Sequence, residues 1–131
     1  MPQRINEHGQ QIGPDVPAWT PRARPHQSPL TGQYAAVVRL DPAAHGDDLF
    51  AAFATDTSGA MWTYMPNGPF TERAVFDAFM TEAKVSTDPL FYAIINKATG
   101  RAEGFASYLR IDPAAGTIEV GFIAMSPLLQ K

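Results

Sequence analysis

Cysteine is absent from the 131 residues, which excludes disulfides, thiolate metal sites and cysteine nucleophiles. Histidine is scarce: the chain has only His8, His26 and His45, and the first two lie in a proline-rich segment. We therefore expect neither a histidine-based catalytic triad nor a zinc site, and no metal cofactor. Any acid–base chemistry falls to a carboxylate, a tyrosine, a backbone group or water.

Long hydrophobic runs and a basic charge excess are also lacking. No apolar stretch approaches the roughly 18 residues that a membrane span needs, and the N-terminus has no signal-peptide core. Ten Lys and Arg against 13 Asp and Glu give a net charge of −3, so neither nucleic acid nor a membrane is an expected partner. We expect a soluble cytoplasmic protein, and its 45% hydrophobic content suffices for the core of one small domain.

The chain divides by composition near residue 33. Residues 1–33 contain half of the 12 prolines and one aromatic residue, Trp19. Because proline blocks helices and lacks a backbone donor, we predict an extended arm, with Trp19 as its anchor if the arm wraps the domain. Residues 34–131 carry the regular hydrophobic patterns of the folded part.

The pattern after residue 33 predicts an α+β fold of order β-α-α-β-β-β. Two helices are expected, at 45–54 with two acidic residues in its first turn, and at 71–84 with Thr71 as N-cap and Phe70 packed on Val75. Apolar runs joined by short turns predict an antiparallel meander as the last three strands. The expected strands are 34–40, 90–96, 102–111 and 117–125.

One segment carries a specific motif. It reads Ile111-Asp112-Pro113, Gly116, Glu119-Val120-Gly121 and then Ser126-Pro127 with Leu129-Gln130. It resembles the GNAT (GCN5-related) N-acetyltransferase superfamily, in particular the branch that includes the ribosomal-protein N-terminal acetyltransferases. The aromatic loop at 62–70 is similar to one subset of that branch.

The resemblance implies a partial GNAT-like fold, with 34–131 as the N-terminal portion of the domain. In the family a glycine-rich loop and a helix start hold the pyrophosphate of acetyl-CoA beyond the position of Lys131, so we expect the C-terminal half to be absent. It further implies transfer of an acetyl group from acetyl-CoA to a primary amine of a small molecule or a protein N-terminus. The alternative is a non-catalytic half-domain that acts as a binding or interaction module. Loss of the second half would expose strand 117–125 and offer it for a homodimer.

The resemblance also implies roles for individual residues. Glu119 is the candidate catalytic base, although a solvent-facing strand carboxylate is the alternative. The backbone of Ile123, Ala124 and Met125 is the candidate acetyl-CoA site, by pairing with the pantetheine arm like an added strand.

Four further residues are candidates for substrate binding. If Ile111 pairs with Thr117, Ser107 falls opposite Gly121 on the face of Glu119, where it contacts substrate or is simply a satisfied strand serine. The loop aromatics either form a wall of the acceptor pocket or cover the core. These aromatics are Trp62, Tyr64 and Phe70.

Overall fold

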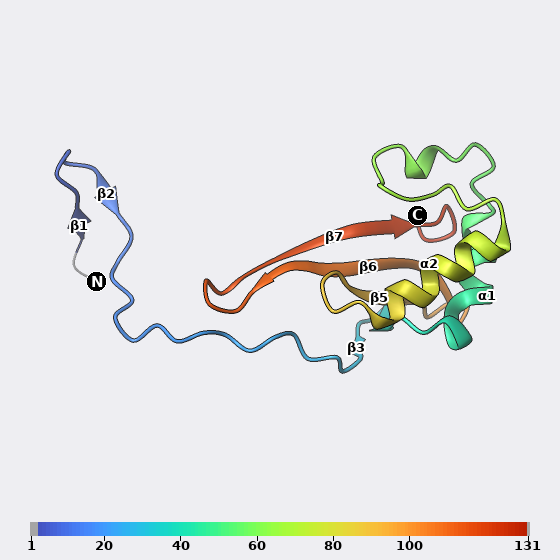
Figure 1. The fold of residues 1–131 in the computed structure, drawn as a ribbon, viewed down its shortest axis with the longest axis horizontal. Coiled ribbons are helices and arrows are strands. Elements are labelled where there is room, and N and C mark those ends of the chain that lie inside the picture. The colour runs from blue at the N-terminus through green and yellow to red at the C-terminus, as the bar shows by residue number, and fades with distance from the viewer. Residues whose placement is uncertain (1–2, 131) are drawn as a thin grey trace.

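A computed structural model describes residues 3–130, in which one antiparallel sheet carries two helices on one face (Figure 1). The strands lie side by side in the order β3 (Leu30–Thr31), β4 (Ala35–Arg39), β5 (Leu90–Asn96), β6 (Arg101–Asp112) and β7 (Thr117–Met125). Strands β5, β6 and β7 form the predicted meander, and β5 and β7 have the predicted bounds. The α+β prediction is confirmed.

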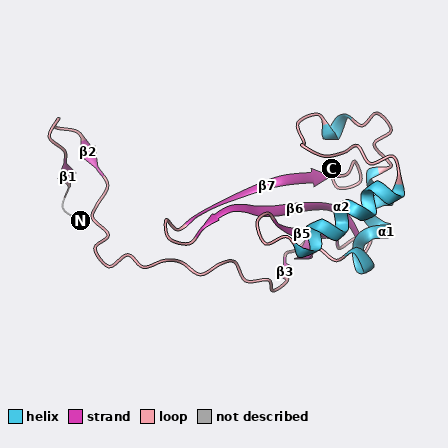
Figure 2. Cartoon of the chain, viewed as in Figure 1, coloured by secondary structure: helices cyan, strands magenta, loops and turns pink. Residues whose placement is uncertain are grey.

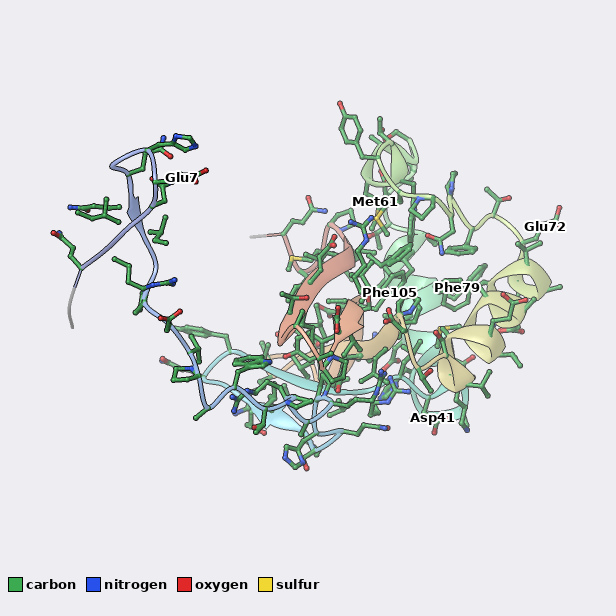
Figure 3. All side chains as sticks on the ribbon, turned by 60° about the vertical axis from the view of Figure 1, so that its left-hand side comes forward. Glu7, Asp41, Met61, Glu72, Phe79 and Phe105 are labelled. Carbon is green, nitrogen blue, oxygen red and sulfur yellow. The ribbon has the colours of Figure 1, made fainter. Side chains whose placement is uncertain are left out.

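The chain between β4 and β5 is helical. It forms α1 (Pro42–Phe53), a short 3₁₀ helix η1 (Ala60–Trp62) and α2 (Arg73–Val85). Aromatic rings join both helices to the same face of the sheet: Phe53 packs edge-on against Phe105 at 5.5 Å, and Phe79 against Phe91 at 5.7 Å. Phe79 and Phe105, labelled in Figure 3, lie within this layer, so an aromatic core separates the helices from the sheet.

The helix starts differ from those that the sequence predicts. Helix α1 begins at Pro42, three residues before the predicted start, because proline suits the first helical position. Its acidic residues therefore lie in the middle of the helix, and the predicted charge stabilisation of its first turn is wrong. Helix α2 begins after Glu72 rather than at a Thr71 cap. Phe70 packs on Phe76 and Phe79, whereas Val75 is exposed.

The described part of the N-terminal arm consists of loops and turns apart from short strands (Figure 2). Strands β1 (Arg4–Ile5) and β2 (Gln11–Ile12) pair with each other, and β3 joins the main sheet beside β4. Trp19 contacts the turn between β6 and β7, where its indole N–H donates to the Ala114 carbonyl at 2.8 Å. Further along, the Tyr92 hydroxyl donates to the His26 carbonyl at 3.1 Å, so the arm crosses the sheet on the side opposite the helices.

Strand β7 is an edge of the main sheet, with β6 as its only neighbouring strand among the described residues. The exposed fractions of Ile118, Val120, Ile123 and Met125 range from 42% to 58%. Neither α-helix of residues 3–130 has the length and apolar character of a membrane span.

Candidate active site

The register of the sheet brings Ser107, Gly121 and Glu119 to one side. Ser107 pairs with Phe91 on one side and Gly121 on the other, and Leu109 pairs with Glu119. Phe91 belongs to the core, so this side is the one that the helices cover. The predicted pairing of Ser107 with Gly121 is confirmed. The prediction that Ile111 pairs with Thr117 is wrong. Asp112 lies opposite Thr117, because the pairing is irregular between Leu109 and Asp112.

Glu119 presents its carboxylate to solvent. Its side chain is 46% exposed, and it forms an ion pair with Arg110, Oε2 to Nη1 at 3.3 Å. Because Arg110 is itself 81% exposed, water screens the pair and the interaction is weak. The carboxylate is therefore accessible and can exchange its partner for an incoming amine or water.

Ser107 is buried and its hydroxyl has a partner. The Oγ donates to the Gly121 carbonyl at 2.9 Å, which ties β6 to β7 beside Glu119. This is the structural role that the sequence also allowed. A substrate would have to compete with that hydrogen bond for the hydroxyl.

A hollow of about 260 Å³ adjoins this side of the sheet. It lies over the point in the sheet where Phe91, Ser107 and Gly121 are opposite one another on neighbouring strands, since Phe91 and the residue after Gly121 both line it. Its walls come from the loops before and after α2, from α2 itself, and from β5 and β7. The lining residues are Asn67, Phe79, Glu82, Ala83, Ser86, Pro89, Phe91 and Phe122. We refer to this space as the acceptor hollow.

Phe122 owes its position in the acceptor hollow to a local irregularity of β7. Its φ of +47° is left-handed, an uncommon conformation for a residue other than glycine. The ring consequently packs against Phe91, with centroids 5.8 Å apart, on the side that Gly121 and Glu119 also face. Two successive residues of one strand thus contribute to the same side of the sheet.

Asn67 is the unusual polar residue of the acceptor hollow. Its Oδ1 is buried and has no hydrogen-bond partner among the described residues. A buried acceptor without a partner is unfavourable, but this oxygen is covered by protein, so a molecule in the hollow does not reach it unless Asn67 or its neighbours move.

The three loop aromatics lie apart from the acceptor hollow. Trp62 is buried and packs edge-on against Phe53 at 5.0 Å and Phe70 at 5.3 Å. Trp62 and Phe70 line a second hollow of about 420 Å³ between the end of α1 and the loop. Tyr64 is 98% exposed. Trp62 and Phe70 therefore cover the core, and their predicted contact with substrate would have to occur in this second hollow.

The end of β7 offers backbone to a ligand. The side chains of Ile123 and Met125 are exposed, whereas Ala124 is buried and lies opposite Phe105. Because β7 is an edge strand, its outer backbone groups have no strand partner in the described chain, which suits an extended molecule with amide groups. The Met125 carbonyl accepts a hydrogen bond from the side chain of Gln130. Residues 126–130 form turns, so no helix start follows β7 within the described residues.

Solved structures that resemble the chain include two acetyltransferases. A GCN5-related N-acetyltransferase from Brucella melitensis is 39% identical, with a TM-score of 0.82 over 86% of this chain and 51% of that one. A probable acetyltransferase of the GNAT family from Chromobacterium violaceum ATCC 12472 is 28% identical, with a TM-score of 0.78 over 92% of this chain and 60% of that one. No family model matches the sequence. No curated protein matches it either.

The chain thus spans about half to three-fifths of the length of these two proteins. Within that span the order of elements and the antiparallel meander agree with the hydrophobic pattern of the sequence and with the GNAT-like fold that the resemblance implies. The chain has a GNAT-like fold, and the solved proteins that share it are GNAT-family acetyltransferases.

Proposed function

We propose that the chain provides the acceptor side of a GNAT-type N-acyltransferase, which moves an acetyl group from acetyl-CoA to a primary amine. The observation that carries the proposal is the position of Glu119. Its accessible carboxylate shares one side of the sheet with the acceptor hollow, on the strand whose outer edge is free. The acetyltransferase neighbours at 28–39% identity support the same reaction class.

Amine acetylation requires a base. A primary amine is mostly protonated at neutral pH and must lose protons before and during attack on an acyl carbon. Acetyl-CoA would supply the acyl group as a thioester: the C–S bond would break as the C–N bond of the amide forms, and CoA would leave as a thiolate that takes up a proton. Glu119 accepts a proton from the amine, directly or through water. Its carboxylate then loses its charge, and the ion pair with Arg110 is lost.

The edge of β7 is the proposed binding site for the donor. The backbone of Ile123, Ala124 and Met125 would pair with the two amides of pantetheine as an additional strand does. Gly104 allows β6 to approach this segment closely, since a Cβ there would lie 2.7 Å from the Ala124 carbonyl oxygen. The exposed edge of these residues would suit the amides of the pantetheine arm.

The motif at 111–130 supports the ribosomal-protein N-terminal acetyltransferase branch. The proposed acceptor is a small molecule or a protein N-terminus, and the proposed compartment is the cytoplasm. Residues 1–33 would be the arm and 34–131 the N-terminal portion of the catalytic domain. The exposed apolar edge of β7 would also support a homodimer.

Binding without catalysis is the second candidate function. It is favoured by the exposure of the Glu119 carboxylate and by its pairing with Arg110, as expected of a solvent-facing strand carboxylate. The two candidates differ in one measurable respect, because a binding module takes up acetyl-CoA without releasing thiol.

Glu119→Gln tests the proposal while preserving the shape of the side chain. Thiol release from acetyl-CoA with an amine present should fall by about 10²–10⁴-fold, with the greatest loss at low pH, where more of the amine is protonated. Glu72→Gln, which removes the same charge from the N-cap of α2, is the control. Nuclear magnetic resonance should show acetyl-CoA perturbing the amides of residues 123–125. Binding there without thiol release supports the second candidate, and no binding refutes both.

A further inference from the structure

We propose that the acceptor hollow selects a small cationic amine on an apolar body and rejects amines that carry a carboxylate or phosphate beside the nitrogen. The inference rests on the proposed function, since it names the substrate class of the same site. It depends on the walls of the hollow and on the one charged residue that lines it.

The walls suit an apolar body. Phe79, Phe91 and Phe122 come from α2, β5 and β7, and their rings meet with centroids 5.7 Å and 5.8 Å apart. At about 260 Å³ the hollow lies just below the range of roughly 300–1,000 Å³ that is usual for ligand sites. One aromatic ring or a short aliphatic chain therefore fits better than a large or wholly polar acceptor.

The charge of the hollow is negative. Glu82 is the one ionisable residue among those lining it. Glu119 lies two residues from Gly121 on the same side of the sheet. Of the nearby cations, Arg110 pairs with Glu119 and Lys84 pairs with Asp41 at 3.1 Å. Arg24 and Arg39 donate to backbone carbonyls instead, and none of these four cations lines the hollow. An ammonium group is attracted to this end of the sheet, whereas an anionic group beside the nitrogen is repelled.

Two ligands with the same aromatic body test the inference without acetyl-CoA. Calorimetry of the 131-residue chain should show 2-phenylethylamine binding about tenfold or more tightly than phenylalanine, which adds only a carboxylate. In ¹⁵N-labelled protein the amides of Phe79, Phe91 and Phe122 should shift on titration with the amine. Equal binding of the two compounds, no binding of either, or shifts confined to the second hollow around Trp62 would overturn the inference.

A matched pair of variants tests the role of charge. Glu82→Gln should weaken binding of 2-phenylethylamine roughly two- to fivefold, as expected for a partly solvated pair, and leave phenylalanine unchanged or slightly tighter. Glu72→Gln removes the same charge from the outer end of α2, away from the hollow, and should have no effect (Figure 3). Equal effects of the two variants would refute the role of Glu82.

Failure of this inference is distinguishable from failure of the proposed function. Selective amine binding with no acetyl transfer leaves the selectivity intact and refutes the transferase. Transfer to both compounds at equal rates refutes the selectivity and leaves the transferase.

Discussion

Gly104→Ala probes the close contact between β6 and the end of β7. An ideal Cβ at Gly104 would lie 2.7 Å from the Ala124 carbonyl oxygen, 3.0 Å from Leu129 Cδ2 and 3.3 Å from Met125 Cα. Two of these three atoms belong to the backbone of β7 and cannot move without separating the strands. The substitution therefore strains the segment to which donor binding is assigned.

The expected loss of stability follows from two opposing effects. Forcing a methyl group into a packed site costs about 1–3 kcal/mol, while replacing glycine returns about 0.4–1 kcal/mol by restricting the unfolded chain. We expect a net loss of about 1–2 kcal/mol in the free energy of unfolding. Acetyl-CoA binding should weaken as well, because Ala124 and Met125 must shift.

Gly121→Ala is the matched control on the neighbouring strand. Its Cβ would lie 2.8 Å from Leu109 Cδ2, the mobile end of a side chain, and 3.6 Å from Glu119 Oε1. Leu109 can rotate away, so the change should stay within about 1 kcal/mol. Urea unfolding followed by the fluorescence of the buried Trp62 measures both variants. The reasoning is refuted if Gly104→Ala is as stable as the parent, or if Gly121→Ala is the more damaging change.

Much of the sheet could be predicted because its signals are local. Apolar runs bounded by turn residues define the two strands that keep their predicted bounds, Leu90–Asn96 and Thr117–Met125. The helix starts could not be predicted as well, because competing cap signals lie within a few residues of one another. Thr71 and Glu72 are both acceptable before α2, and the packing of Phe70 on α2 accompanies a start after Glu72.

The candidate site was predictable only where pairing decides it. Strand alternation from an assumed Ile111–Thr117 pair places Ser107, Gly121 and Glu119 on one side of the sheet. The result holds because the irregularity after Leu109 offsets the one-residue error at the turn. The sequence gives no comparable signal for Phe122, because its left-handed backbone depends on the irregular pairing of β6 with β7. Glu82 reads as a solvent-facing helix residue, and only the packing of α2 on β5 brings it to the hollow.

Three further predictions concern the arm, the loop and one buried histidine. Trp19→Phe removes the indole donor that holds the arm to the β6–β7 turn, so amide exchange in residues 3–24 should accelerate while the sheet is unaffected. Trp62→Ala should lower the free energy of unfolding by about 3–5 kcal/mol, whereas the exposed Tyr64→Ala should change it by less than about 0.5 kcal/mol in urea titrations. His45 is buried, and its Nδ1 accepts a hydrogen bond from the Asp41 N–H at 3.0 Å. Burial holds the pKa of His45 below its usual value of 6.5, against the opposing effect of Asp41 and Asp48. Below pH 6.5 the unfolded chain therefore binds more protons at this residue than the folded chain, and stability falls as the pH falls until the folded pKa is reached. His45→Gln should abolish that part of the pH dependence in urea titrations between pH 7.5 and 5, a range set by the ordinary histidine pKa of about 6.5. An unchanged pH profile in His45→Gln would show that the neutral imidazole does not stabilise the start of α1.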